Sequence, residues 1–253
     1  MPPHGFRRLA GALGLMAGLA ALPAEGAPAC AALPPRDPMP REARPERLHY
    51  PPSLARVAEL SRVAAGGLAG ARMIFLGDSI TQAWDPATWA AHYAARGAVN
   101  FGVMGDFVQG LLWRLQQEGH WPATLRPRLA VLLIGTNNAS YNSRPEDTAL
   151  GIAEVVRFIR RRSPETRVLV LGILPRGAEA SDPTRRVNAR VNELVARCAD
   201  GEWVFYADPG PVLLDARGRL AASIAPDRLH LAPEGYARLS AALEPTIRDL
   251  LAR

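Results

Sequence analysis

Five short apolar runs, none of which alternates polar with apolar side chains, constrain the fold of this chain most strongly. They cover residues 73–76, 98–101, 129–134, 168–171 and 203–206. An uninterrupted apolar run of this length is typical of a strand that is buried on both faces of its sheet. Amphipathic stretches separate the runs, so strands and helices are expected to alternate. This order predicts parallel strands joined by right-handed crossovers, and hence a three-layer α/β sandwich.

Helical periodicity is clearest in the second half of the chain. Behind Asp182, a residue suited to capping, apolar side chains recur at helical spacing as far as Cys198. The stretch 144–162 shows the same pattern. A last helix is predicted from Pro233, with a kink or break at Pro245.

The composition excludes several kinds of chemistry. All 30 basic residues are arginine, and a chain without lysine has neither a Walker A phosphate loop nor a Schiff-base amine. Two cysteines are too few for a Cys₄ zinc site or an iron–sulfur cluster. The net charge of +6 raises the question of nucleic acid, but no reading motif accompanies it, and Arg185 with Arg186 is interpreted as a solvated helix face. We expect no metal, no cofactor and no nucleic-acid partner.

The first 29 residues have the order of an export signal. Arg7 and Arg8 precede an apolar stretch, 9–22, and small residues follow up to position 29. The stretch is shorter than the roughly 20 residues that span a bilayer, so no stable transmembrane anchor is expected. Residues 1–29 are therefore predicted to be a signal peptide of a protein exported to the periplasm or the extracellular space. A buried first helix is the alternative.

Residues 30–52 contain seven prolines with interleaved charge, which indicates an extended leader in front of a folded domain of residues 53–253. Cleavage after Ala29 would place Cys30 at the new N-terminus, where lipidation is a minor alternative. In an oxidising compartment Cys30 has a second option, a disulfide with Cys198. Cys198 is more simply explained as a small buried residue on an apolar helix face.

Loops that follow the predicted strands carry candidates for acyl transfer. Ligands of open parallel sheets bind at the carboxyl ends of the strands, and Ser79, Gly105 and Asn137 follow the first three runs. A serine hydroxyl is too weak an acid to attack an ester without a histidine base. Only His230 has a carboxylate at a useful spacing, Asp227, which would orient its imidazole. The sequence therefore predicts a triad of Ser79, His230 and Asp227 at one edge of the sheet.

Donors for the developing oxyanion are expected in the same loops: the backbone N–H groups of Ser79 and Gly105 and the side-chain amide of Asn137. Each of these residues has a structural alternative. Ser79 and Gln82 have the spacing of a capping box. Gly102 and Gly105 are also suited to a turn that requires positive φ. Asn137 is also a common turn residue, with a side chain that bonds its own backbone.

These residues resemble the SGNH, or GDSL, hydrolase superfamily, whose four blocks supply Ser, Gly, Asn and His in this order. Within it the chain is similar to the catalytic α subunits of platelet-activating-factor acetylhydrolases, through segments 75–80, 100–102, 112–115, 135–138, 174–177 and 229–231. The resemblance implies a flavodoxin-like parallel five-stranded sheet, a metal-free serine esterase, and Asp227 as the triad acid. Phe107 and Val108 replace two threonines that are usual in those subunits, which alters the expected acyl pocket.

We therefore expect an exported serine esterase that hydrolyses short-chain, acetyl-type esters of carbohydrates or other small molecules through an acyl-enzyme. The candidate substrate contacts are Asp78, Trp84, Phe107, Val108, Asn138 and Arg176. Of these, Trp84 is the candidate sugar platform, and Arg176 either meets an anionic group or braces its loop. One alternative is a longer-chain lipase, lysophospholipase or thioesterase, with Phe107 and Val108 lining an apolar channel. The other is a non-catalytic carbohydrate- or envelope-binding module of the same fold.

Overall fold

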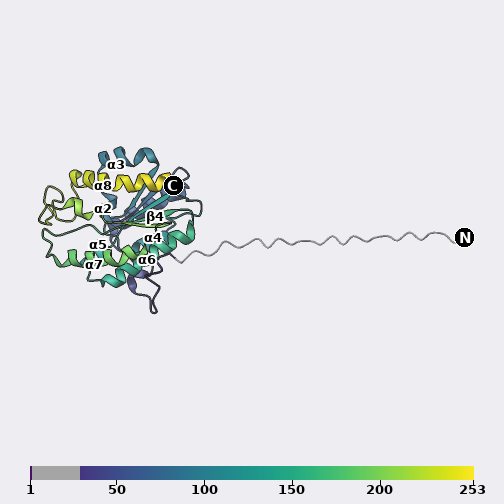
Figure 1. The fold of residues 1–253 in the computed structure, drawn as a ribbon, viewed down its shortest axis with the longest axis horizontal. Coiled ribbons are helices and arrows are strands. Elements are labelled where there is room, and N and C mark those ends of the chain that lie inside the picture. Colours follow the sequence, from purple (N-terminus) through teal and green to yellow (C-terminus); the bar gives the residue numbers. More distant parts are fainter. Residues whose placement is uncertain (2–28) are drawn as a thin grey trace.

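Five strands pair in parallel in the computed structural model, which describes residue 1 and residues 29–253 (Figure 1). They are β1 (Met73–Gly77), β2 (Ala98–Gly102), β3 (Leu129–Leu133), β4 (Arg167–Leu171) and β5 (Val204–Ala207). Their order, β2-β1-β3-β4-β5, is the doubly wound order of a flavodoxin-like sheet. Every predicted run coincides with a strand to within one residue at each end, so the predicted fold class is confirmed. Residues 2–28, which hold most of the predicted export signal, lie outside the described residues.

Helices cover both faces of the sheet (Figure 1). One face carries α1 (Pro51–Ala65), α4 (Val108–Gln116), α6 (Pro145–Arg162) and α7 (Pro183–Val195), and the other carries α3 (Pro86–His92) and α8 (Pro233–Ala252). Successive strand side chains point to opposite faces, so Ile74 and Leu76 pack in the first core and Met73 and Phe75 in the second. Short turns of helix complete the fold: α2 (Ser79–Gln82), α5 (Thr136–Ser140), η1 (Arg41–Ala43), η2 (Ala94–Arg96), η3 (Ala196–Cys198) and η4 (Gly210–Leu213).

The longer helices begin where the sequence predicts. The Asp182 carboxylate caps α7, and α8 begins at Pro233. The predicted break at Pro245 is absent, because α8 continues through this residue to Ala252. Within residues 29–253, none of the helices combines the length and the apolar character that crossing a bilayer requires.

Arg185 corrects one prediction about the surface. It was expected on a solvated face, yet it is 8% exposed. Its guanidinium donates hydrogen bonds of 2.6–2.8 Å to the backbone carbonyls of Arg176, Gly177 and Gly218. Arg176 and Gly177 belong to the loop after β4, and Gly218 belongs to the segment before α8. Both segments pack against the start of α7, and the sequence around Arg185 does not predict this packing.

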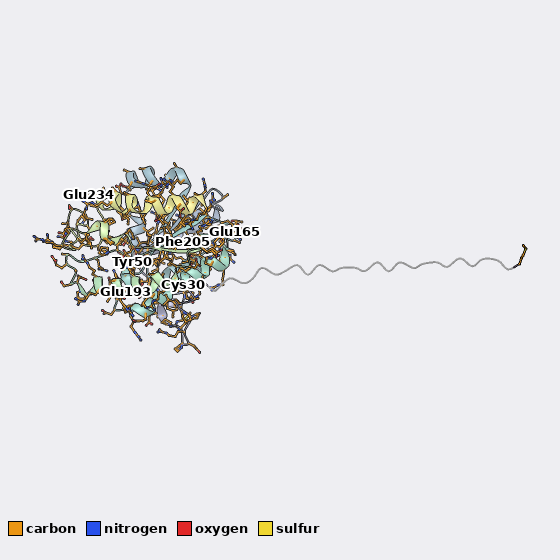
Figure 2. The ribbon with its side chains drawn as sticks, in the orientation of Figure 1. Cys30, Tyr50, Glu165, Glu193, Phe205 and Glu234 are labelled. Atoms are coloured by element: carbon orange, nitrogen blue, oxygen red, sulfur yellow. A yellow bond between two sulfur atoms is a disulfide. The ribbon has the colours of Figure 1, made fainter. Side chains whose placement is uncertain are left out.

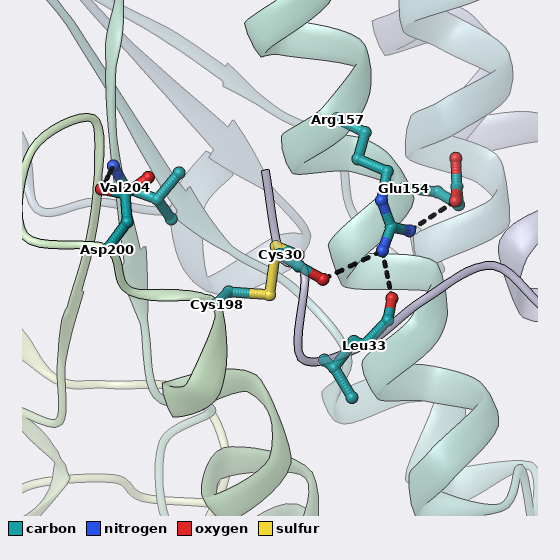
Figure 3. Close-up of a disulfide and its surroundings, with 7 residues drawn as sticks. All are labelled: Cys30, Leu33, Glu154, Arg157, Cys198, Asp200 and Val204. Carbon is teal, nitrogen blue, oxygen red and sulfur yellow. Dashed lines mark hydrogen bonds and ion pairs between the residues drawn. A yellow bond between two sulfur atoms is a disulfide. The ribbon is translucent and has the colours of Figure 1, made fainter. Parts of the chain in front are cut away.

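The chain before α1 lies against the helical layer formed by α4 and α6. We call residues 30–50 the strap; Figure 2 labels its two ends, Cys30 and Tyr50. Cys30 forms a disulfide with Cys198, 168 positions further along the chain (Figure 3). Arg157 of α6 donates to the carbonyl oxygens of Cys30 and Leu33 in the same region. Cys198 is therefore buried but bonded rather than a simple core residue, and the Cys30 sulfur cannot also carry a lipid.

Further along, the strap fits closely against two helix glycines. A Cβ on Gly151 of α6 would lie 2.3 Å from the carbonyl oxygen of Glu42, and a Cβ on Gly110 of α4 would lie 2.9 Å from the Leu48 side chain. Leu48 is buried in the core between sheet and helices. The strap is thus anchored by a covalent bond at one end and by packing near the other.

Candidate active site

Ser79 lies directly after β1, where the strand order of the sheet reverses and ligand crevices form. The residue that caps α2 is Asp78, whose carboxylate accepts a 2.9 Å hydrogen bond from the backbone N–H of Ile80. Gln82 accepts from the backbone N–H of Met104 instead of from the start of the helix. The capping-box explanation of Ser79 is therefore wrong, and its hydroxyl is free for another partner.

That partner is His230. The Ser79 Oγ is 2.9 Å from Nε2 of His230, and the other ring nitrogen, Nδ1, is 2.7 Å from a carboxylate oxygen of Asp227. Ser79 and His230 are 151 positions apart in the chain. The His230 side chain is 44% exposed, so the three groups open to solvent. They form the hydrogen-bonded chain through which an imidazole can remove a serine proton.

The loop before α8 fixes the orientation of His230. The second oxygen of Asp227 accepts from the backbone N–H groups of Leu229, at 3.0 Å, and of His230, at 2.7 Å. Burial acts to raise the pKa of Asp227, but the hydrogen bonds from the His230 ring and from these two N–H groups outweigh it and lower the pKa. The ionised carboxylate holds a proton on Nδ1, which leaves Nε2 as the acceptor.

Three N–H donors with spare capacity lie on the loops after β1, β2 and β3. The backbone N–H groups of Ser79 and Gly105 donate to no acceptor among the residues that the structure describes. The Asn137 side-chain amide donates at 2.8 Å to the carbonyl oxygen of Asp106, and its second hydrogen remains for a ligand. The strands that precede these loops end in register, with Gly77 beside both Gly102 and Leu133.

Gly102, the last residue of β2, and Gly105, in the turn that follows, have different roles. Gly102 has no positive φ; a Cβ there would lie 2.1 Å from the backbone nitrogen of Gln82, so glycine is needed for the close approach of α2. Gly105 has φ +71°, and a Cβ there would meet only ordinary contacts at 3.5 Å or more. Glycine at 105 is therefore favoured by backbone conformation.

A buried ion pair beside this turn escaped the sequence analysis. Arg114 and Asp106 are both fully buried, and Nε and Nη2 of Arg114 lie 2.8 and 2.7 Å from one Asp106 oxygen. The other oxygen accepts from the backbone N–H of Phe107. Burial raises the pKa of Asp106 to about 6, and the guanidinium keeps the carboxyl ionised at neutral pH. In the sequence, the one indication of this ion pair was the spacing of eight residues, about two helical turns, between Asp106 and Arg114.

His120 completes this cluster as a neutral residue. Its Nδ1 is 3.1 Å from Nη1 of Arg114, and its Nε2 is 3.2 Å from the carbonyl oxygen of Val57. Burial and the Arg114 charge lower the pKa of His120 to about 3. The three side chains hold the turn that carries Gly105 without touching solvent.

Most of the candidate substrate contacts are buried. The exposed fractions are 1% for Asp78, 4% for Trp84, and 0% for Val108 and Asn138. Trp84 donates to Ser240 of α8, so it is a core residue and no sugar platform. Asn138 accepts from the backbone N–H of Val108 and donates to Gln109. These four residues therefore stabilise the loops around the site, because the helices on both faces close over them.

Arg176 and Phe107 retain exposed surface. Arg176 donates through Nη1 to the backbone carbonyl and hydroxyl of Thr136 and to the Ser140 hydroxyl, which braces α5 and the Asn137 that it carries. Of the two interpretations of Arg176, the loop brace is the one these contacts support. Phe107 packs edge-on against Tyr141, with ring centroids 5.0 Å apart.

Asp78 gives a pH prediction. Burial, assisted by the Asp106 charge and opposed by the Ile80 N–H, raises the pKa of Asp78 to about 7. The unfolded carboxyl ionises near pH 4, so this group's contribution to stability is complete in acid and declines as the pH rises from about 4 to 7. We expect Asp78→Asn, which keeps the acceptor for Ile80, to match the parent Tm at pH 4 and to exceed it by several degrees at pH 8. Thermal scans at both values test this, and a pH-independent difference in Tm would contradict it.

Comparison with known proteins agrees with this geometry. A model of the GDSL-like Lipase/Acylhydrolase family matches residues 75–238. Platelet-activating factor acetylhydrolase IB subunit alpha1 of Pongo abelii is 36% identical over 183 residues, which cover 72% of this chain and 77% of the relative. The fold is shared with a GDSL-like lipase from Bacteroides thetaiotaomicron, at TM-score 0.58 and 22% identity over 76% of this chain and 98% of that one. It is also shared with Axe2, an acetylxylan esterase from Geobacillus stearothermophilus, at TM-score 0.57 and 19% identity over 72% of this chain and 94% of that one.

The matched region contains the serine, the histidine and the buried Arg114, and it spans the sheet from β1 into α8. Family, fold and hydrogen-bonded geometry therefore agree on acyl hydrolysis. The chain belongs to the GDSL-like lipase/acylhydrolase family and is a carboxylic ester hydrolase.

Proposed function

We propose that this protein is an exported serine esterase that removes short acyl groups, with Ser79 as nucleophile, His230 as base and Asp227 as the residue that orients the base. The observation that carries the proposal is the 2.9 Å separation of the Ser79 Oγ from the His230 Nε2, with Asp227 on the far side of the ring. No cofactor enters the proposed reaction.

In the proposed reaction, Nε2 of His230 takes the Ser79 proton while Oγ attacks the ester carbonyl carbon. The carbonyl oxygen becomes an oxyanion, which the free N–H groups of Ser79 and Gly105 and the Asn137 amide stabilise. The imidazolium then protonates the alcohol as it leaves, and the acyl group stays on Ser79. Water, deprotonated by the same imidazole, then attacks the acyl carbon. As the bond from that carbon to Oγ breaks and the acid leaves, the imidazolium returns its proton to Oγ and restores the serine.

The Asn137 amide is expected to act mainly in the transition state. Replacing Asn137 by alanine should lower kcat about 10²–10³-fold with little change in KM, because one oxyanion donor is lost. Steady-state kinetics on 4-nitrophenyl acetate measure both parameters, and an unchanged Tm serves as the control for folding. A raised KM with kcat intact would assign Asn137 to ground-state binding instead.

The compartment is inferred from the disulfide. A bond between Cys30 and Cys198 requires oxidising conditions, which the periplasm and the extracellular space provide. When the full chain is expressed in a bacterial host, we expect the periplasmic or secreted product to begin at or near Cys30 and to contain no free thiol. Intact mass and thiol titration test this. A cytoplasmic product that retains residues 1–29 would contradict it.

A preference for short acyl groups is supported by what surrounds the catalytic residues. Of the two residues expected to line an apolar channel, Val108 is buried in the core and Phe107 lines the cavity that reaches Gly105. Most of the other side chains around that cavity are polar or charged. We expect kcat/KM to be highest for acetate in a series of nitrophenyl esters and to fall with each longer chain. An optimum at eight or more carbons would favour the lipase or thioesterase alternative. A purified, folded protein that a serine-directed fluorophosphonate fails to label would favour the non-catalytic module.

A further inference from the structure

A cavity of about 330 Å³ lies between the strap and the loops of the catalytic edge. The strap supplies one wall, with Arg47, His49 and Tyr50. Gly105 and Tyr141, which follow β2 and β3, also line it. The volume is at the lower end of the range for small-ligand pockets. None of the triad residues lines this cavity, so it is a neighbouring space rather than the catalytic centre itself.

The cavity adjoins the groups that would hold the oxyanion. Gly105, whose backbone N–H is a proposed donor, forms part of its lining. Tyr141 closes α5, and its backbone N–H donates at 3.2 Å to the carbonyl oxygen of Asn137. The cavity therefore begins beside two of the three donors, where part of a bound ester would extend away from the reacting carbon.

Its chemistry favours a neutral ligand with many hydroxyl groups. Tyr50 and Tyr141 are 54% and 74% exposed, and large aromatic surfaces at this exposure are suited to covering the flat face of a ring. The charged lining residues are two arginines, at 41 and 47, and two glutamates, at 42 and 46, so opposite charges balance. Arg41 is already paired with Glu46. This balance disfavours a strongly anionic ligand.

Contacts at both ends hold the strap in place. The Glu46 backbone N–H donates at 3.1 Å to the carbonyl oxygen of Gln109, and Ser53, just beyond Tyr50, donates to the carbonyl of Met104 in the turn before Gly105. The Cys30–Cys198 disulfide anchors the other end of the strap. Since Tyr50 stands on this segment, the shape of the cavity depends on the strap staying seated.

We propose that this cavity is the subsite for the alcohol part of the ester, that it takes a sugar ring, and that the disulfide-anchored strap is its specificity-determining wall. The inference rests on the proposed function, since it presumes that Ser79 is acylated by the ester. Tyr141 acts here by covering the sugar ring, and the strap acts by presenting Tyr50 to the same cavity.

The test compares two acetate esters in the mature, oxidised protein. Ethyl acetate has an alcohol too small to fill the cavity, whereas a mono-acetylated methyl xyloside fills it. We expect Tyr141→Ala to raise KM for the xyloside ester about 5- to 10-fold, the effect of one aromatic contact, and to leave kcat/KM for ethyl acetate unchanged. Tyr141→Phe, which keeps the ring, should behave like the parent.

Each other outcome overturns the inference. If Tyr141→Ala affects the kinetics of both esters equally, or of neither, the cavity does not bind the alcohol part of the substrate. A shift only in acyl-length preference would make it an acyl pocket, and a selective loss on an acetylated phospholipid would make it a lipid-headgroup site. A parent protein that hydrolyses neither ester and resists fluorophosphonate would instead reject the proposed function itself.

The strap is tested separately with Cys30→Ser/Cys198→Ser. If this double variant folds, as judged by circular dichroism, we expect a raised KM for the xyloside ester and an unchanged kcat/KM for ethyl acetate. If it does not fold, Tyr50→Ala in the disulfide-bonded protein gives the same comparison. An unaltered KM for the xyloside ester in the folded double variant, or in Tyr50→Ala, would show that the strap is not a wall of the subsite.

Discussion

Replacing Ser79 by alanine is expected to lower kcat/KM for acetate esters by about 10⁴–10⁶-fold, because the nucleophile of a triad has no substitute. The same change should leave the free energy of unfolding within about 0.5 kcal/mol of the parent. Asp78 caps α2, and among the residues that the structure describes the Ser79 hydroxyl bonds only to the His230 ring. Hydrolysis of 4-nitrophenyl acetate and urea unfolding measure the two effects.

Asp78→Ala is the matched control for the helix cap. It removes the acceptor for the Ile80 N–H and is expected to change stability, as the loss of a cap does. If Ser79→Ala lowers the free energy of unfolding enough to account for the lost activity by unfolding, Ser79 is a structural residue. Residual turnover close to that of the parent would place the nucleophile elsewhere.

Replacing Arg114 by methionine is expected to destabilise the fold by about 3–5 kcal/mol, because it leaves the buried Asp106 carboxylate without its cation. The effect should reach the active site as well. Asp106 follows Gly105, and its carbonyl accepts from the Asn137 amide, so a displaced turn moves two proposed oxyanion donors together. Guanidinium chloride unfolding measures the stability, and kcat measures the position of the donors.

The double variant Asp106→Asn/Arg114→Met separates charge from packing. It removes the unpaired charge, so we expect it to recover part of the stability that the single variant loses. If the double variant is as unstable as the single one, the loss comes from packing around Arg114. A single variant within about 1 kcal/mol of the parent would show that water reaches Asp106.

Much of the fold was predictable from local patterns. A strand buried on both faces must be apolar throughout, so 73–76 and 129–134 were recognisable without knowing their neighbours. Asp182 likewise marked the start of α7, because a cap acts within one helical turn. The break predicted at Pro245 does not occur, since packing of α8 across the sheet tolerates one missing backbone hydrogen bond.

The candidate site was predictable for a different reason. Parallel strands place all their carboxyl ends at one edge, so Ser79 and Asn137 could be expected to meet. His230 follows no strand, and only its spacing from Asp227 and the family resemblance pointed to it. Trp84 was misplaced because an apolar residue close to a nucleophile has the same local sequence whether it faces the substrate or the core. Val108 was expected at the acyl pocket from the family resemblance, which does not show that α4 buries this side chain.

Local periodicity and turn chemistry were therefore enough for the sheet and its longer helices, since each depends on residues a few positions apart. The candidate reacting groups also required the shared edge of the parallel strands and the family resemblance. The disulfide of Cys30, the burial of Arg114 against Asp106 and the cavity under the strap became known only from the tertiary structure. Each of these depends on how separate segments of the chain pack against one another. Such contacts are selected by the packing free energy of the whole fold, which no single stretch of sequence contains.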